Sequence, residues 1–142
     1  MRSGIFLIVL LIAPCLAAAQ QGITGSVVVV EGNQMPGPGQ KRPEAKPARR
    51  NVVVYALTNQ QETTLRDGLF SDLKTERIAK TRSKRNGRFR ISLPPGRYSI
   101  FVEEADGLYA NVWDAEMNIH PVTVTAKTFS NVKIEITRNA SF

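Results

Sequence analysis

Short runs of β-branched residues alternate with polar turn segments along most of the chain, and this pattern predicts strands rather than helices. The first run covers residues 23–31 and holds SVVVV at its centre, and the second covers residues 51–59 as NVVVYALTN. Apolar residues fall on both faces of these two runs, which is typical of strands covered on two sides. Five more strands are expected, at residues 77–85, 88–93, 97–104, 121–126 and 132–137. Seven strands without a crossover helix predict an all-β, antiparallel, Ig-like sandwich.

Two of the connecting segments have a distinct composition. Residues 32–50 combine prolines and glycines with many cations and almost no apolar residue, so they predict a long, basic, flexible loop. Residues 60–74 carry leucines at near-helical spacing that Asp67-Gly68 interrupts. They predict a loop with one helical turn packed on the edge of a sheet.

The basic segment 77–93 contains an Asn86-Gly87 turn signal whose register can be tested by side-chain parity. A two-residue turn would place three cations beside the apolar residues of the next strand, and buried unpaired charges are prohibitive. A three-residue loop over 85–87, with Gly87 left-handed in a bulge, instead sets small residues such as Ser83 and Ala79 opposite that apolar face. We therefore predict the three-residue loop.

Pro94-Pro95-Gly96 is the next turn signal, and it predicts a hairpin that pairs residues 88–93 with residues 97–104. In that hairpin Arg88 faces Glu103, and Arg90 faces Phe101 in a cation–π contact. The alternation of the two strands selects the core candidates, which are Phe89, Ile91, Leu93, Tyr98, Ile100 and Val102.

The first twenty residues, MRSGIFLIVLLIAPCLAAAQ, have the features of a secretory signal peptide. Arg2 is followed by an apolar run too short for a membrane-spanning helix, and Ala17-x-Ala19 fits a cleavage site before Gln20. Pro14 argues against a lipoprotein, because a lipid-modified cysteine such as Cys15 is normally preceded by a small residue. We expect an exported protein, periplasmic or secreted, whose single domain covers residues 20–142. It would have no membrane span after cleavage and no disulfide, since Cys15 is the only cysteine.

The formal net charge of +7 favours anionic partners such as a membrane surface or an acidic glycan. Nucleic acid is not expected as the partner of an exported protein. The parity of the basic segment places five cations on one outer face, where they would face an anion. The alternative is a solvated ribbon over which acids from neighbouring loops fold. This candidate patch consists of Lys80, Arg82, Lys84, Arg88 and Arg90.

Several short motifs together resemble the carboxypeptidase regulatory-like domain, a prealbumin-like sandwich. They are Gly25 with Val27, Val52 with Val54, Thr81, Gly87 with Phe89, and Leu93-Pro94-Pro95-Gly96 with Tyr98. The resemblance implies a seven-stranded Ig-like sandwich with no catalysis of its own. Such domains accompany exported peptidases, outer-membrane receptors and surface proteins, and some relatives in the wider fold bind carbohydrate. The chain departs from the family pattern in its long basic first loop and in the basic residues before Gly87.

Residues that could carry chemistry are few. His120 is the only histidine, and Asp114 and Glu116 beside it make a weak zinc set, because zinc sites usually have more nitrogen or sulfur ligands. We expect no catalytic site, no metal and no cofactor. The first functional hypothesis is a structural or protein-interaction module of the cell envelope. The alternative is a carbohydrate-binding module that uses Tyr109 and Trp113, two aromatic residues on the expected loop 106–118.

Overall fold

The computed structural model describes residues 20–142, which form an all-β structure with one short 3₁₀ turn, η1 (Gln60–Glu62). The expected signal peptide, with Cys15, lies outside the described residues. Among residues 20–142, no helix has the length and apolarity needed to cross a membrane. The strands are β1 (Gly22–Val29), β2 (Gly32–Asn33), β3 (Lys46–Pro47), β4 (Asn51–Ala56), β5 (Thr64–Arg66), β6 (Leu69–Ser71), β7 (Arg77–Arg82), β8 (Arg88–Ser92), β9 (Gly96–Glu104), β10 (Gly107–Tyr109), β11 (Pro121–Val124), β12 (Phe129–Ile136) and β13 (Ala140–Ser141).

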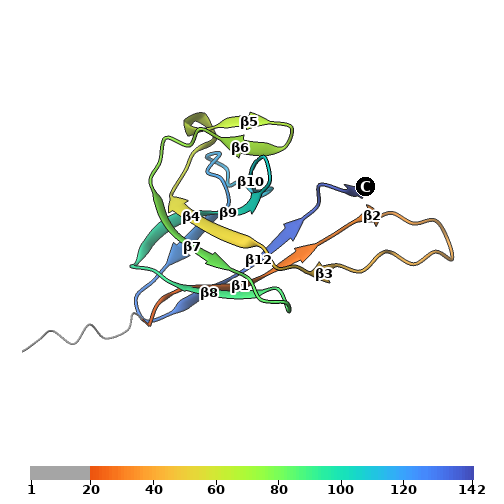
Figure 1. The fold of residues 1–142 in the computed structure, drawn as a ribbon, viewed down its shortest axis with the longest axis horizontal. Coiled ribbons are helices and arrows are strands. Elements are labelled where there is room, and N and C mark those ends of the chain that lie inside the picture. Colours follow the sequence, from red (N-terminus) through yellow and green to blue (C-terminus); the bar gives the residue numbers. More distant parts are fainter. Residues whose placement is uncertain (1–19) are drawn as a thin grey trace, which may run out of the picture.

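Two sheets pack face to face as the predicted sandwich (Figure 1). In the small sheet, β1 pairs with β12 on one side and with β8 and then β3 on the other. In the large sheet the order is β5-β6-β10-β9-β4-β7, and β11 also pairs with β9. The pairings are antiparallel except for β1–β12 and the short β2–β13 contact, which are parallel.

The hydrophobic core lies between the two sheets and contains the residues that strand parity selected. Phe89, Leu93 and Tyr98 are buried there, together with Ile100 and Val102. Ile91 is half-buried and packs against the same cluster. The predicted core is therefore confirmed.

Gly25 explains how the small sheet accommodates an aromatic ring. It lies opposite Phe89 in the β1–β8 register, and a Cβ at Gly25 would fall 2.1 Å from the carbonyl oxygen of Val132 and 3.0 Å from the ring of Phe89. Only glycine fits between this ring and the neighbouring parallel strand, and the ring covers the backbone that glycine leaves bare.

The outer face of the large sheet is covered by a region that we call the cap, which includes the β5–β6 end of that same sheet. The cap consists of residues 57–76, with η1, β5 and β6, and residues 110–120 (Figure 1). Beneath it Phe70, Phe101 and Ile119 form a second buried cluster. β4 is thus covered on both sides, as its sequence predicts, and Val52, Val53 and Val54 are all buried. The same expectation is wrong for β1, whose outward residues Thr24, Ser26 and Val28 are only half-buried.

The expected loop over residues 60–74 contains more structure than predicted. A helical turn is present at Gln60–Glu62, but the leucine-rich part forms a β-hairpin, in which Arg66 pairs with Leu69. The two turn residues, Asp67 and Gly68, have φ values of 52° and 76°. Both angles are positive, as a type I′ turn requires, so Asp-Gly specifies a tight hairpin here instead of breaking a helix.

The predicted hairpin at Pro94-Pro95-Gly96 is wrong. β8 pairs with β1 in the small sheet, and β9 pairs with β4, β10 and β11 in the large sheet, so this segment carries the chain from one sheet to the other. The hydroxyl of Tyr98 donates a hydrogen bond of 2.6 Å to the carbonyl oxygen of Pro94. This tyrosine corner fixes the crossover, as the equivalent bond does in Greek-key sandwiches.

The predicted three-residue turn over 85–87 is confirmed, but the ladder that was expected beyond it is not. The Lys84 amide donates to the Arg88 carbonyl at 2.9 Å, and Gly87 has a φ of 79°. Beyond the turn the two strands separate, because β7 pairs with β4 and β8 pairs with β1. Ser83 and Ala79 therefore do not lie opposite the apolar residues of β8.

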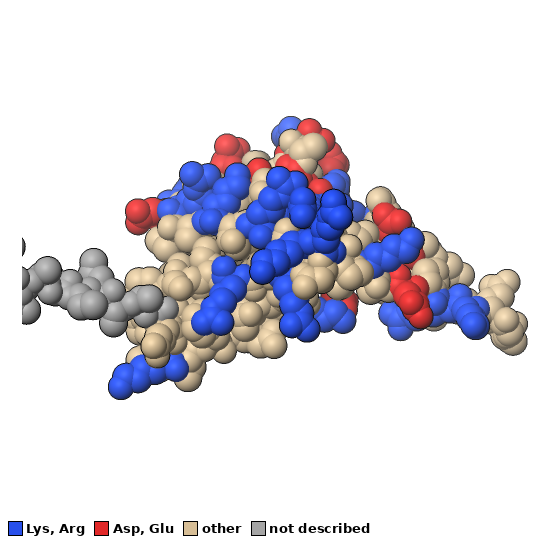
Figure 2. Space-filling view, turned by 60° about the horizontal axis from the view of Figure 1, so that its bottom comes forward, with Lys and Arg blue, Asp and Glu red and all other residues tan. Residues whose placement is uncertain are grey.

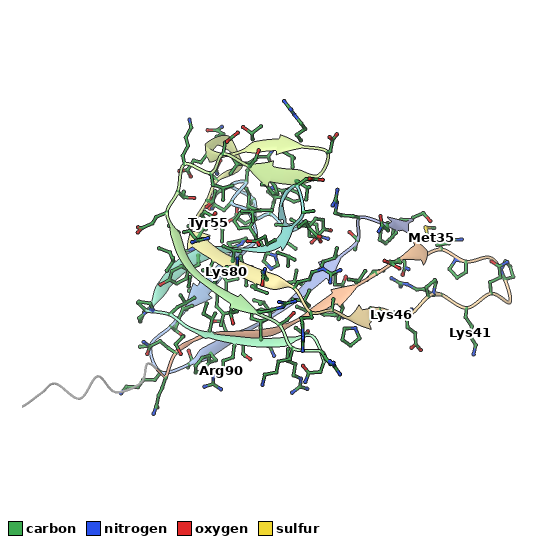
Figure 3. All side chains as sticks on the ribbon, viewed as in Figure 1. Met35, Lys41, Lys46, Tyr55, Lys80 and Arg90 are labelled. Atoms are coloured by element: carbon green, nitrogen blue, oxygen red, sulfur yellow. The ribbon has the colours of Figure 1, made fainter. Side chains whose placement is uncertain are left out.

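The basic segment 32–50 forms a long arm that projects from the body (Figure 1). At its base β2 pairs with β13, and β3 pairs with β1. Within the arm the Arg42 Nε donates to Gln34 Oε1 at 2.7 Å. Met35 and Lys41 lie along the arm, and Lys46 lies near its base (Figure 3).

Candidate functional site

The five predicted cations lie where the two sheets meet edge to edge. β7 is the last strand of the large sheet, β8 is an outer strand of the small sheet, and the 85–87 turn joins them. We call this region the basic seam. It comprises the exposed cations between residues 80 and 90, namely Lys80, Arg82, Lys84, Arg85, Arg88 and Arg90.

The cations of the seam do not share a single sheet face, which corrects the parity argument. Lys80 lies beside Val53 and projects from the outer face of the large sheet, and Arg90 lies beside Thr24 on the outer face of the small sheet. Figure 3 shows Lys80 next to β4 and β7, and Arg90 on the far side of β8. The ladder expected between these strands would have aligned them, but each strand pairs with a different sheet.

Few acids neutralise the seam. Glu103 accepts from Lys80 at 3.1 Å, and within residues 20–142 no carboxylate lies within ion-pairing distance of Arg82, Lys84 or Arg88. Figure 2 shows lysine and arginine side chains gathered on one side of the body with few acids among them. Clustered like charges repel each other and create a positive surface potential, which attracts an anion.

Two predicted contacts of the seam are wrong because they depended on the hairpin between β8 and β9. Glu103 pairs with Lys80 rather than with Arg88. The guanidinium of Arg90 lies 3.8 Å from the ring centroid of Phe129, whereas Phe101 is buried under the cap. The hydrogen bonds from Lys80 and Asn51 hold the pKa of Glu103 below its ordinary value.

The two aromatic residues proposed for glycan binding do not form a common platform. Tyr109 is buried, and the Thr137 amide donates to its hydroxyl at 3.0 Å. Trp113 retains 38% of its accessible surface and packs against Phe70, with 6.1 Å between the ring centroids. Trp113 is therefore the aromatic residue of this pair that presents a face to solvent.

Trp113 lies on a small hairpin of the cap in which it bridges to Ile119. Met117 occupies the turn with a φ of 66°, a conformation usually taken by glycine. Val112 and Met117 are also exposed, with 45% and 46% of their surfaces accessible. The sequence did not predict the turn at Met117, because a positive φ at a methionine has no signal in the sequence.

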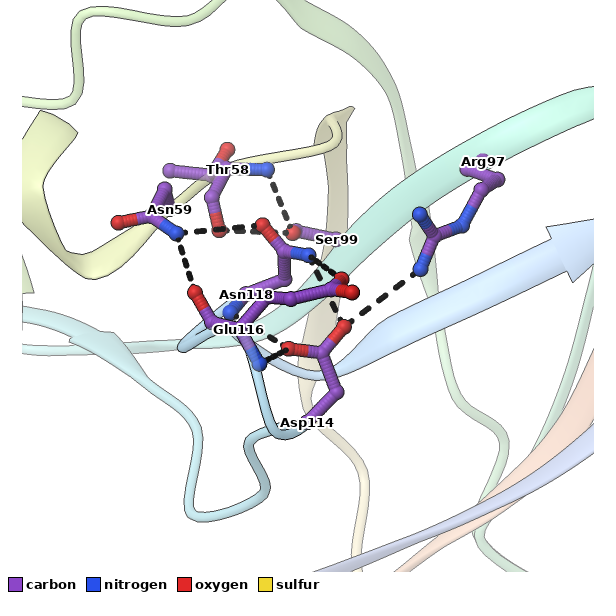
Figure 4. Close-up of polar contacts among 7 residues, drawn as sticks. All are labelled: Thr58, Asn59, Arg97, Ser99, Asp114, Glu116 and Asn118. Atoms are coloured by element: carbon purple, nitrogen blue, oxygen red, sulfur yellow. Dashed lines mark hydrogen bonds and ion pairs between the residues drawn. The ribbon is translucent and has the colours of Figure 1, made fainter.

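A polar network holds this hairpin on the sheet (Figure 4). Asp114 accepts hydrogen bonds from the amides of Glu116 and Asn118 and from the Asn118 side chain, each at 2.9 Å, and pairs with Arg97 at 3.5 Å. Asn59 donates to the Glu116 carbonyl at 2.8 Å. These hydrogen bonds, the side-chain bond from Asn118 first, keep the pKa of Asp114 below its ordinary value.

His120 follows this hairpin and is buried. Burial lowers the pKa of its imidazole to about 4, and its Nδ1 has no hydrogen-bond partner among the described residues. The oxygen atoms of Asp114 are directed to Asn118, Glu116 and Arg97, not to His120. Within residues 20–142 no group of three or more histidine, cysteine or acidic side chains is placed to hold a metal ion.

No family model, no curated protein and no solved structure matches this chain.

Proposed function

We propose that this protein is a non-catalytic β-sandwich module of the cell envelope that acts by binding a partner protein, and that the basic seam is its binding surface. The observation that carries the proposal is that five of the six seam cations have no acid within ion-pairing distance among residues 20–142, namely Arg82, Lys84, Arg85, Arg88 and Arg90. The partner would present an acidic surface.

The position of the cations on edge strands supports this proposal. An exposed edge presents unpaired backbone groups, and charged side chains discourage it from pairing with an identical edge. Cations on both edges repel a second copy of the chain and attract a surface of opposite sign. The attraction is long-ranged at low salt and weakens once the screening length falls to about 10 Å at 0.1 M ionic strength.

Export and the family resemblance belong to the same proposal. The leader of residues 1–19 would deliver the domain to the periplasm or the medium, where partners bind it without a catalytic step. The tyrosine corner at Tyr98 and the packing of Phe89 on Gly25 give physical reasons for motifs that the chain has in common with carboxypeptidase regulatory-like domains.

A second candidate function is carbohydrate binding through Trp113. The observation in its favour is an indole with 38% of its surface accessible on a hairpin fixed by Asp114. A sugar ring could stack on that indole. With Tyr109 buried, this site would have one aromatic contact instead of two.

The test is retention on immobilised heparin, used as a generic polyanion, and on an acidic protein surface. The double variant Arg82→Glu and Arg90→Glu should elute from both at much lower salt than the wild type, because it reverses charge on both sides of the seam. The matched control reverses two exposed arginines outside the seam, Arg66 and Arg138.

The control variant has the same net charge as the seam variant, so overall charge alone predicts equal elution of the two. Equal elution would contradict the proposal, provided that thermal unfolding shows both variants folded. A parallel titration with neutral oligosaccharides, followed by the fluorescence of Trp113, separates the second candidate from the first.

A further inference from the structure

The outer face of the small sheet holds a shallow polar cavity that the fold and the seam do not account for. Its volume is about 230 Å³, and it is lined by side chains and backbone from three adjacent strands. β8 contributes Arg88, β12 contributes Asn131, and β1 forms the floor with Thr24, Gly25 and Ser26. Thr24 lies beside Asn131, and Ser26 lies beside Arg88, in the sheet register.

The floor of the cavity is low because β1 has only small residues there. Gly25 turns inward over the ring of Phe89, and the outward side chains of β1 on either side of it are the short hydroxyls of Thr24 and Ser26. The longer side chains of Arg88 and Asn131 stand on the neighbouring strands. The result is a hollow with walls of nitrogen donors and a floor of hydroxyl groups.

These donors have few protein partners. The Thr24 hydroxyl donates its one hydrogen to the Phe89 carbonyl at 3.3 Å, so in this rotamer it shapes the floor and is not a donor to a ligand. Within residues 20–142, the Arg88 guanidinium, the Ser26 hydroxyl and the Asn131 amide form no side-chain hydrogen bond, and no carboxylate lines the cavity. The side chains of Arg88, Ser26 and Asn131 can each donate a hydrogen bond to a ligand in the cavity, and the guanidinium of Arg88 is permanently charged.

We propose that this cavity is a binding site for a tetrahedral oxyanion, a sulfate or phosphate group. Donors approach from three strands, which matches the several oxygen atoms of a tetrahedral group better than the two coplanar oxygens of a carboxylate. The guanidinium of Arg88 offers a fork of N–H groups suited to two of these oxygens. The volume is below the range of about 300–1,000 Å³ typical of drug-sized ligands, so the cavity suits one such group rather than a large molecule.

The surroundings add positive potential to the site. Arg90 and Lys133 lie beside Thr24 and Ser26 in the same sheet face, on the strands that flank the cavity. Arg90 stacks on Phe129, and Lys133 is paired with Glu135 at 3.1 Å. Neither side chain lines the cavity, so neither is proposed to contact the oxyanion directly. Arg88 remains the cation that lines the cavity.

This inference goes beyond the proposed function, with which it shares Arg88. The seam requires an extended acidic surface, whereas the cavity would bind a free oxyanion whether or not the seam has a partner. A sulfate group could come from a sulfated glycan, and a phosphate group from a lipid headgroup. The chemistry of recognition is the same in both cases.

The experiment is titration of the ¹⁵N-labelled protein with inorganic sulfate, and separately with phosphate, against chloride at constant ionic strength. Saturable shifts should concentrate on the backbone amides of Thr24, Ser26, Arg88 and Asn131 and on the Asn131 side chain. Arg88→Ala should weaken sulfate binding by about tenfold or more, as expected for hydrogen bonds to a charged group. Ser26→Ala with Asn131→Ala should weaken it by roughly threefold to tenfold without changing the net charge.

Arg88→Lys and Arg82→Ala are the controls. Arg88→Lys keeps the charge and loses the fork, so it should bind sulfate less tightly than the wild type. Arg82→Ala removes an equal charge from the large sheet and should leave sulfate binding within about twofold, since an exposed charge outside the site contributes little. Shifts spread evenly over all exposed cations, or equal losses in Arg82→Ala and Arg88→Ala, would overturn the proposal.

The source of the oxyanion is distinguished in a second arm with sulfated oligosaccharide and with vesicles that contain anionic phospholipid. Shifts or broadening at the same cavity amides with one of the two probes identify the source, and competition by inorganic sulfate confirms that the site is shared. If the seam variant loses heparin retention while inorganic sulfate still binds the cavity, the two proposals succeed independently. If sulfate fails to bind the cavity while the seam variant still loses retention, only the cavity is overturned.

Discussion

The two faces of the large sheet are both buried, but by different means. The inner face packs on the small sheet through an apolar cluster that includes Val52, Val54 and Ile100. The outer face packs on the cap, where Phe70 and Ile119 cluster with Phe101 of β9. The inner layer is made of strands in continuous ladders, whereas the cap is held by short hairpins and by side-chain hydrogen bonds around Asp114 and Asn59.

This difference shows that one sheet can have two kinds of cover with different stability. In the sandwich each strand is tied along its length, as in the eight-residue register of β1 with β12. In the cap β6 touches β10 through the single pair Phe70 and Leu108, and β5 pairs with β6. Elements with few long-range contacts open more readily than the core. We therefore expect the cap to open before the sandwich unfolds.

Truncation of one phenylalanine in each layer is the most severe test of this comparison. Phe89→Ala in the sandwich should lower the free energy of unfolding by about 3–5 kcal/mol. Phe70→Ala removes similar packing from the cap, but it should lower the global value less. If the packing energy removed by Phe70→Ala exceeds the free energy of opening the cap, the cap opens while the sandwich remains folded.

Urea unfolding and amide hydrogen exchange measure the two effects together. Phe70→Ala should lose protection over residues 64–73 and 113–119 while β1, β9 and β12 stay protected. If Phe70→Ala reduces the unfolding free energy as much as Phe89→Ala and exchange rises evenly over the chain, the two layers are one cooperative unit.

The pH dependence of stability gives a second test, through His120. Burial lowers its folded-state pKa from 6.5 to about 4. Above about 6.5 both states are neutral, and as pH falls towards 4 the unfolded state takes up a proton that the folded state refuses, so stability decreases. The loss should reach about 3 kcal/mol below pH 4, because each pKa unit corresponds to about 1.4 kcal/mol.

The control for this prediction is His120→Asn. Asparagine tolerates the positive φ of 35° at this position and does not titrate. Its unfolding free energy, measured by urea denaturation at intervals between pH 7 and pH 4, should lack the contribution of His120. An equal pH dependence in both proteins would show that the pKa of His120 is the same in the folded and unfolded states, and would contradict the prediction.

The smallest expected effect is local and concerns Asp114. Its pKa is held below the ordinary value, so its ionised form stabilises the hairpin above about pH 4, and this contribution is lost as pH falls further. Asp114→Asn cannot reproduce all the accepted hydrogen bonds. It should speed amide exchange at Glu116 and Asn118 while leaving β1 and β12 unchanged. Unaltered exchange at these two amides would mean that Asn59 alone secures the hairpin.

Some of the tight turns could be predicted from the sequence and others could not. Side-chain parity identified the loop over 85–87 with Gly87 left-handed, because a shorter turn would have buried cations. The Asp67-Gly68 signal was present in the sequence, but we interpreted it as a break in a helix, since the leucines around it have near-helical spacing. The cap hairpin around Met117 could not be found this way, because a methionine at a positive φ gives no turn signal.

The candidate site was predictable in composition but not in arrangement. Five of the six cations of the seam were predicted from their spacing, yet their distribution over two sheets depends on the crossover at Pro94–Gly96. The contact of Arg90 with Phe129 joins residues far apart in the sequence. The cavity of Arg88, Ser26 and Asn131 likewise requires three strands to be neighbours, and no local pattern specifies this.

The sequence by itself determined the all-β class, the buried face of the central strands and the tight turn at Gly87. These follow from alternation and from backbone conformation, which are properties of adjacent residues. Only the tertiary structure decided which strands pair, where the chain changes sheets and which charges become neighbours. The physical reason is that every residue type except proline offers the same main-chain donor and acceptor, so alternation specifies which side of a strand is buried but not which strand lies beside it.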